Sequence, residues 1–232
     1  MIVLKDKQQC CGCSACAQVC PKKCIAMQPD EEGFLYPQID QAACIECGLC
    51  EKVCPMLQSP AEDTNRQPKA YAAYNKDETI RLQSSSGGVF TLLALQTLQN
   101  GGMVFGAALS ADCKSVHHTM VSNEADLAKL RGSKYLQSEI EVCYEQAQTF
   151  LRQGKPVLFS GTPCEIEGLK TFLRQDYANL TCVDLICHGS PSPQLWEKYV
   201  EYRKKENGQT VKEAYFRHKK YGWQEFSVKL RF

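Results

Sequence analysis

The sequence lacks a long apolar run, because its longest candidate, residues 89–95, is interrupted by Gln96, and a membrane span needs ~18 such residues. It also lacks an excess of one charge. The 27 lysines and arginines balance 26 aspartates and glutamates, which gives no general electrostatic case for binding nucleic acid. The first residues have neither the apolar stretch nor the cleavage site of a secretory signal. We therefore expect a soluble, cytoplasmic protein with no membrane or nucleic-acid partner.

Cysteine, by contrast, is abundant: the 232 residues include 15 cysteines, ten of them between positions 10 and 54. In a small secreted protein this density would indicate a disulfide framework. The length of the chain and the missing signal peptide argue against that class. In a reducing cytosol, dense cysteine indicates metal or redox chemistry.

Eight of these cysteines form two runs of equal spacing, C-x2-C-x2-C-x3-C followed by proline. Bacterial ferredoxins with two 4Fe–4S clusters have this spacing, and the fourth cysteine of each run ligates the other cluster. The predicted ligands of the first cluster are Cys10, Cys13, Cys16 and Cys54. Those of the second cluster are Cys44, Cys47, Cys50 and Cys20. Zinc, the alternative, favours isolated C-x2-C pairs. We expect the leftover Cys11 and Cys24 to lie beside the ligands.

The composition divides the chain into three parts. Residues 1–58 are expected to form an α+β ferredoxin-like two-cluster domain, and the polar residues 59–69, with two prolines, a linker. Residues 70–232 alternate strand and helix patterns, which predicts an α/β domain with a mainly parallel sheet. Strands are expected at 70–74, 103–109, 117–121, 156–160, 180–187, 211–216 and 226–232, and helices at 89–99, 124–130, 138–152, 163–173 and 194–204. The last strand pattern runs to Phe232, which predicts a fragment of a longer protein.

Several segments of the α/β domain could bind a ligand. The segment Ser84-Ser85-Ser86-Gly87-Gly88 precedes a helix, where free N–H groups and hydroxyls suit a phosphate; simple helix capping is the alternative. Cys164 lies in the first turn of a helix, whose dipole favours a thiolate ligand or nucleophile. Cys187, with His188, follows a strand and could be a ligand or half of a redox pair. A buried structural role is the alternative for either cysteine. Lys134 could contact a phosphate or flavin atom, or lie in a solvated loop.

Other side chains of this domain have simpler interpretations. His117 and His118 are adjacent in an expected strand, so they face opposite sides and cannot easily chelate one metal together. The basic turn around Lys219 is expected to be solvated. We expect Trp196 and Trp223 in the core or at an interface.

Taken together, these segments resemble the beta-subunit family of coenzyme F420 hydrogenases and dehydrogenases, in its bacterial form with a ferredoxin domain fused at the front. The resemblance rests on the order and spacing of residues 84–90, 130–135, 161–169 and 184–193. It implies that the α/β domain binds a flavin, FAD. It also implies a further 4Fe–4S cluster, two of whose ligand positions match Cys164 and Cys187. The family's other two ligands form a C-x2-C pair, which this chain lacks after Cys187, so that cluster is expected to be incomplete here.

We therefore predict an iron–sulfur flavin oxidoreductase of an anaerobic metabolism. Its flavin would exchange hydride with a small molecule, such as coenzyme F420 or a similar donor, and the clusters would exchange electrons with a redox partner or ferredoxin. No residue is predicted to act as acid or base. The alternatives are a non-catalytic ferredoxin-like subunit of a larger redox complex, a thiol enzyme with Cys164 as nucleophile, and an adaptor with vestigial clusters.

Overall fold

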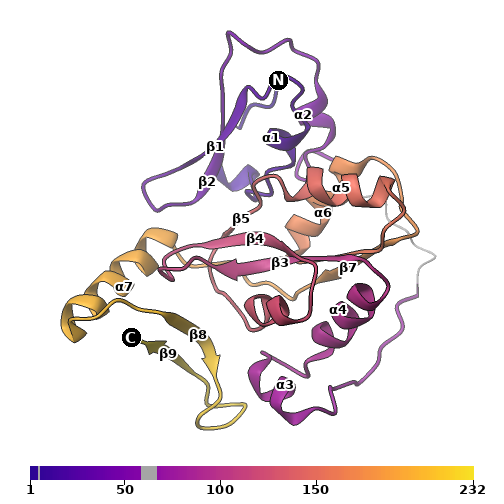
Figure 1. Cartoon of the computed structure of the whole chain (residues 1–232). Helices are drawn as coiled ribbons and strands as arrows, with labels where there is room; N and C mark the ends of the chain where they lie inside the picture. The colour runs from indigo at the N-terminus through magenta and orange to yellow at the C-terminus, as the bar shows by residue number, and fades with distance from the viewer. Residues whose placement is uncertain (5, 59–66) are drawn as a thin grey trace.

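The computed structural model describes residues 1–4, 6–58 and 67–232 of the chain (Figure 1). The predicted linker at 59–69 therefore lies largely outside the described residues. None of the described helices is long and apolar enough to cross a membrane.

Residues 1–58, here called the N-terminal unit, have the small α+β architecture expected of a ferredoxin-like fold. Strands β1 (Ile25–Pro29) and β2 (Leu35–Ile39) form an antiparallel hairpin between the two cysteine runs. The carboxylate of Asp30 accepts hydrogen bonds from two backbone N–H groups of its turn. The helical segments of this unit are η1 (Lys7–Gln9), α1 (Ala15–Val19) and α2 (Leu49–Lys52).

The rest of the described chain is built on a mixed, mostly parallel five-stranded sheet with the order β5-β4-β3-β6-β7. Only the β3–β4 pair is antiparallel. The strands are β3 (Met103–Leu109), β4 (Val116–Val121), β5 (Ser138–Glu139), β6 (Val157–Gly161) and β7 (Leu180–Asp184). The helices around it are α3 (Glu78–Gln83), α4 (Val89–Gln99), η2 (Ala125–Leu130), α5 (Cys143–Arg152) and α6 (Pro163–Leu173).

Alternation along the central strands creates two apolar cores. Phe105 of β3 and Phe159 of β6 are fully buried on the face covered by α5 and α6. Their neighbours Val104 and Leu158 point to the opposite face, where they pack with Ala94 of α4. The sheet is therefore covered on both sides, as a mostly parallel sheet requires.

A third apolar cluster lies where the chain ends. Helix α7 (Pro193–Asn207) and the antiparallel hairpin β8 (Glu213–His218) and β9 (Ser227–Arg231) pack beside the sheet (Figure 1). Trp196 is buried there, with its ring centroid 4.5 Å from that of Phe216. This confirms the core prediction for Trp196, whereas Trp223 is exposed in the hairpin loop.

Two predicted elements are wrong. Residues 70–74 are exposed and, within the described part of the chain, pair with no strand; the neighbouring Asn75 N–H bonds to the Gly87 carbonyl instead. The helix predicted from Ser138 begins only at Cys143. Burial of Leu136, Ser138 and Ile140 follows the period of two that belongs to strand β5.

The N-terminal unit shares a core with the sheet. Cys13, Ala15 and Val53 are buried in the same cluster as Phe105 and Phe159. The side chain of Gln18 reaches across this boundary, where its Oε1 accepts hydrogen bonds from the N–H groups of Tyr144 and Glu145 at 3.0 and 3.4 Å. Gln18 thus caps the first turn of α5 from another part of the chain. Residues far apart in the sequence therefore depend on each other for stability.

We expect Gln18→Ala to lower the free energy of unfolding by about 1–2 kcal/mol, because it removes an N-cap from α5. Anaerobic urea titration of the intact protein measures this change. Gln8→Ala is the matched control, since the Gln8 side chain is exposed, and it should leave the free energy of unfolding within about 0.5 kcal/mol of the parent. Equal stabilities of the Gln18 variant and the parent would contradict the capping role.

Candidate functional site

The sulfur atoms of the N-terminal unit surround two separate cavities. The first has about 320 Å³ of open space, and Met27, Pro37 and Met56 contribute to its apolar wall. Its cysteines are Cys10, Cys11, Cys13, Cys16 and Cys54. The structure thus brings together the whole set predicted for the first cluster, with the leftover Cys11 beside it.

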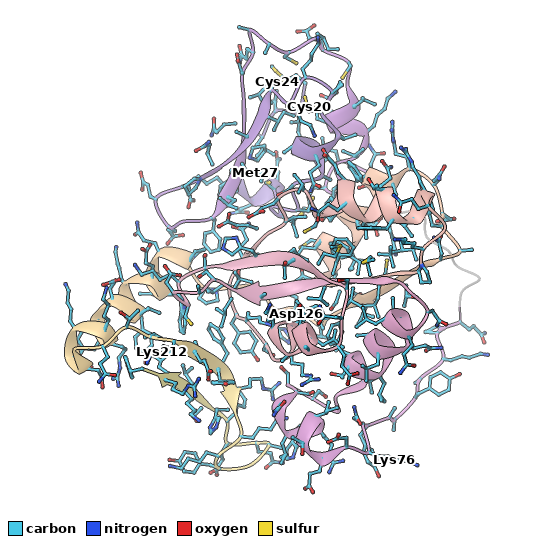
Figure 2. The ribbon with its side chains drawn as sticks, viewed as in Figure 1. Cys20, Cys24, Met27, Lys76, Asp126 and Lys212 are labelled. Atoms are coloured by element: carbon cyan, nitrogen blue, oxygen red, sulfur yellow. The ribbon has the colours of Figure 1, made fainter. Side chains whose placement is uncertain are left out.

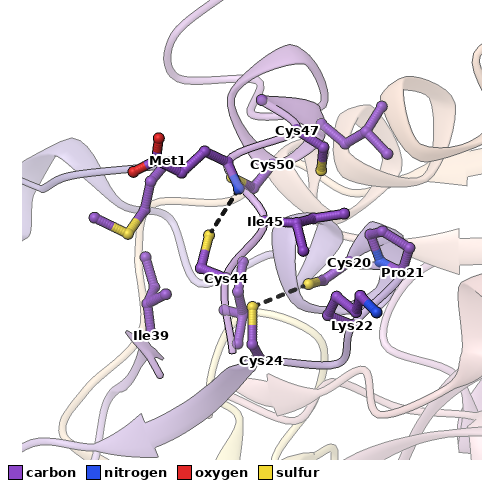
Figure 3. A pocket seen from close by; sticks show the side chains of 14 residues that line it. Met1, Cys20, Pro21, Lys22, Cys24, Ile39, Cys44, Ile45, Cys47 and Cys50 are labelled. Atoms are coloured by element: carbon purple, nitrogen blue, oxygen red, sulfur yellow. Dashed lines mark hydrogen bonds between the residues drawn. The ribbon is translucent and has the colours of Figure 1, made fainter. Parts of the chain in front are cut away.

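Figure 3 shows the second cavity, which has about 360 Å³ of open space. In Figure 2, Cys20 and Cys24 of this cavity lie farther from the sheet than Met27 of the first cavity. Ile39 and Ile45 line the walls of the second cavity. Its cysteines are Cys20, Cys24, Cys44, Cys47 and Cys50. These include the whole set predicted for the second cluster, and the Sγ of Cys24 lies 3.4 Å from that of Cys20.

The short helices α1 and α2 explain why the last cysteine of each run lies at the cavity of the other run. Its residues 15–19 contain Cys16 of the first cavity and end just before Cys20, which faces the second. Helix α2 contains Cys50 of the second cavity, and the chain returns to the first at Cys54. A short helix thus connects one sulfur set to the other in each direction.

The spacing of the sulfur atoms suits a polynuclear cluster better than a single metal ion. Four thiolates around zinc, at ~2.3 Å from it, lie only ~3.8 Å apart. Among the described residues, no three cysteine sulfurs lie within 4.8 Å of one another. A cubane holds its cysteines at separate corners, so its ligands need a wider cavity, and all the donors here are thiols. The residues of both cavities therefore fit a 4Fe–4S cluster.

Backbone groups are also arranged to support charged sulfur. The N–H groups of Ile2, Gly12 and Glu46 each donate to a cysteine Sγ, at 3.3–3.4 Å. Gly12 has a φ of +69°, which an L side chain would strain. Burial raises the pKa of Cys16 to about 12, so this thiol must lose its proton when a metal binds.

The first cavity lies against the sheet. A Cβ added to Gly168 of α6 would lie only 2.9 Å from the Cβ and 3.0 Å from the Sγ of Cys13. The hydroxyl of Thr171, one turn further along α6, donates to the Val53 carbonyl at 2.7 Å. Because Gly168 has no side chain, α6 approaches the first cysteine run directly.

Cys164 and Cys187 follow the neighbouring strands β6 and β7, in which Gly161 pairs with Asp184. The surroundings of Cys164 oppose the effect of the helix dipole, which favours a thiolate. The thiol of Cys11 next to it and burial raise the pKa of Cys164 well above its usual value. Cys187 is exposed, and its Sγ accepts a hydrogen bond from the Gly189 N–H at 3.4 Å.

The predicted phosphate segment at 84–88 and the Lys134 loop lie together. The Ser133 hydroxyl donates to the Ser85 hydroxyl at 2.7 Å. Four residues after Ser133, the Oε1 of Gln137 accepts a hydrogen bond from the Leu35 N–H of strand β2 at 2.8 Å. The loop therefore joins the Ser84–Gly88 segment to the N-terminal unit.

Sequence reasoning missed the contact that Lys219 makes with this segment. Its Nζ donates to the carbonyl of Ser84 and, at 3.2 Å, to that of Arg81. The β8–β9 loop thus reaches the start of α4, and the predicted solvated turn is wrong for this residue. The sequence showed only that this turn is basic. It could not show the contact, because Lys219 and Ser84 are more than 130 residues apart in the chain.

His118, to which the sequence assigned no chemical role, is buried. Its Nδ1 lies 2.7 Å from the Ser138 hydroxyl and its Nε2 3.0 Å from the Ser160 carbonyl. Burial lowers the pKa of His118. The neighbouring His117 is partly exposed, which confirms that the two rings face opposite sides of β4.

Three family models match the chain. The model described as a 4Fe-4S dicluster domain matches residues 9–57. The two models of the coenzyme F420 hydrogenase/dehydrogenase beta subunit match residues 70–142 (N-term) and 154–232 (C terminus). The chain belongs to the coenzyme F420 hydrogenase/dehydrogenase beta-subunit family.

No curated protein matches this member of the beta-subunit family. Among solved structures, it is similar to a chain of the F420-reducing NiFe hydrogenase complex from Methanosarcina barkeri, with 18% identity and a TM-score of 0.48. That match covers 68% of this chain but only 57% of the hydrogenase chain.

The surroundings of Lys134 predict a pH dependence of the protein's stability. Burial lowers the pKa of Lys134 to about 7, and its Nζ donates to the Arg131 carbonyl at 3.0 Å. Between pH 7 and about 10.5, the unfolded chain therefore binds more protons at this lysine than the folded chain. Its contribution to the free energy of unfolding should increase as pH rises through this window.

Lys134→Met removes that titration, so the stability difference between variant and parent should change between pH 7.5 and 9.5. Urea titrations at both values measure the two free energies of unfolding. Lys129→Met, at an exposed lysine, is the control and should show the same pH dependence as the parent. A parallel pH dependence of the Lys134 variant and the parent would rule out a neutral buried lysine.

Proposed function

We propose that this chain is an iron–sulfur flavoprotein oxidoreductase that passes electrons between a flavin and two 4Fe–4S clusters. The observation that carries the proposal is the division of eight cysteines between two cavities of the N-terminal unit. Membership of a hydrogenase and dehydrogenase family supports oxidoreductase chemistry.

The residues of the N-terminal unit would hold and insulate the clusters. Cys10, Cys13, Cys16 and Cys54 would ligate the first, and Cys20, Cys44, Cys47 and Cys50 the second. Apolar neighbours such as Met27 and Ile39 would limit the access of water, while the N–H groups directed at sulfur would offset negative charge. Each cluster, when bound, supplies one-electron transfer at a potential that these surroundings adjust.

The position of the first cavity supports electron transfer between the N-terminal unit and the region after residue 70. Cys13 contacts α6 at Gly168. An electron that passes between a cluster in the first cavity and a group bound beside α6 would therefore cross little intervening protein. We propose that residues 1–58 form the domain that holds the clusters, that residues 59–69 connect the two domains, and that residues 70–232 form the domain that binds the flavin.

For the flavin, FAD, we propose residues Ser84–Gly88 and Lys134. The Ser133–Ser85 hydrogen bond brings these two segments together, which supports one shared site. A flavin supplies both hydride exchange with a small molecule and single-electron exchange with clusters. We propose coenzyme F420 or a similar hydride carrier as that molecule and a ferredoxin-type protein as the redox partner, in an anaerobic cytoplasm.

Cys164 and Cys187 are proposed as two ligands of a third 4Fe–4S cluster in a longer form of the protein. They follow paired strands, which supports a common location. The chain printed here has no C-x2-C pair after Cys187 to supply the other two thiolates.

An electron-transfer subunit without flavin is the second candidate, and one observation favours it. A hydroxyl of the Ser84–Gly88 segment is already engaged within the protein. The Ser84 hydroxyl donates to the Ile80 carbonyl at 2.7 Å. A phosphate that accepts from this hydroxyl would have to displace that contact.

Anaerobic purification followed by measurement of iron, sulfide and flavin tests both candidates. Two clusters and one flavin correspond to about eight irons, eight sulfides and one FAD per chain. About eight irons with no flavin, even after FAD is added, would reject the flavoprotein in favour of the electron-transfer subunit. Iron well below eight after reconstitution would reject both.

Cys54→Ser tests the crossed ligand sets. Loss of a first-cluster ligand should reduce the iron content from about eight to about four per chain and leave the second cluster. Cys182→Ser is the matched control, because Cys182 packs against the sheet core and lines neither cavity. An iron content of about eight in the Cys54 variant would exclude Cys54 as a ligand.

A further inference from the structure

A second group of metal-ligating side chains lies at the opposite edge of the sheet from β7, and none of its members lines a sulfur cavity. His117 of β4 and Glu139 of β5 are direct partners in the parallel β4–β5 ladder. Directly paired residues project from the same face of a sheet. Glu141 follows two residues after Glu139, with a φ of +47°, and its carboxylate also faces His117.

These three side chains place one nitrogen and two oxygens around a common point. The His117 Nδ1 lies 3.8 Å from the Glu139 Oε2 and 3.3 Å from the Glu141 Oε1. All three atoms lie within 4.8 Å of one another. This is the one such group of three or more histidine, cysteine and carboxylate side chains in the described part of the chain.

The distances suit ligands of one metal ion better than a direct ion pair. A charge-assisted N–H···O bond is ~2.7–2.9 Å long. Ligands at ~2.0–2.2 Å around a tetrahedral metal lie ~3.3–3.6 Å apart. The nitrogen–oxygen separations at His117 are close to the second range and wider than the first.

The environment of the His117 imidazole also favours a role as a metal ligand. The Nδ1 atom of His117 is buried and has no hydrogen-bond partner among the described residues. Its other nitrogen, Nε2, lies 2.8 Å from the Ser115 hydroxyl oxygen. When Nε2–H donates to Ser115, the lone pair of Nδ1 faces the two carboxylates. Such second-sphere hydrogen bonds orient histidine ligands in metal sites.

No competing cation occupies this position. Within the described residues, neither Glu139 nor Glu141 forms an ion pair with a lysine or arginine. The two carboxyl groups thus concentrate oxygen donors and negative charge around one point. The side chains of His117, Glu139 and Glu141 are 33%, 41% and 58% exposed, so an ion can enter from solvent.

We propose that His117, Glu139 and Glu141 bind a divalent cation of the first transition row, separate from the iron–sulfur sites. One imidazole and two carboxylates are donors that zinc, manganese and ferrous iron accept. Three protein ligands leave at least one coordination position to water or to an oxygen of another molecule. The site is independent of the proposed function, because it shares no residue with the cysteine cavities or the flavin segment.

Manganese is the probe, because this hard cation prefers carboxylates and leaves thiolates alone. Titration of the anaerobically purified, cluster-loaded protein with Mn²⁺, followed by the EPR signal of free Mn²⁺, should show one bound ion per chain. The isosteric double variant Glu139→Gln and Glu141→Gln should weaken binding at least about tenfold. Ser115→Ala keeps all three ligands and should weaken binding about tenfold through loss of orientation.

Glu124→Gln, which removes an exposed carboxylate at the start of η2, is the matched control and should bind Mn²⁺ like the parent. Iron content and circular dichroism report whether each variant is folded and loaded. Absence of bound Mn²⁺ at millimolar concentration would overturn the proposal. Equal Mn²⁺ binding by the parent and the double glutamine variant would also overturn it, because the ion would then be bound by other carboxylates of the surface.

Discussion

The close approach of helix α6 to the first cysteine run is the contact on which the arrangement depends. Gly168 lies so near Cys13 that any side chain there would collide with its sulfur. Around this point, Ala15 and Val53 join the apolar core of the sheet. The first sulfur cavity is therefore held at the boundary with the sheet rather than at the end of a separate module.

Polar contacts fix the orientation of the N-terminal unit around that point. Gln18 caps α5, Thr171 bonds to the Val53 carbonyl, and Gln137 bonds to Leu35. These bonds satisfy backbone groups that would otherwise be buried without partners. A boundary made in this way is specific, because a shift of either side would break several hydrogen bonds at once.

In the region after residue 70, two groups of candidate functional side chains lie at different places around the sheet. The loop 131–138 passes from Ser85 at the start of α4 to the N-terminal unit at Leu35. On the outer edge of the same sheet, β4 and β5 bring His117 and Glu139 together. The proposed redox sites and the proposed cation site therefore share no side chain.

The sequence by itself predicted which cysteines group together and the mostly parallel α/β architecture, because these depend on local spacing and periodicity, and its short motifs carried the resemblance to the family. The limits of α4, β3 and α6 were predicted to the residue. Only the tertiary structure decided that Lys219 contacts Ser84, that Cys11 lies beside Cys164 and that β5 replaces the start of a helix. Such contacts join residues far apart in the chain, and burial in the folded core overrides local preference.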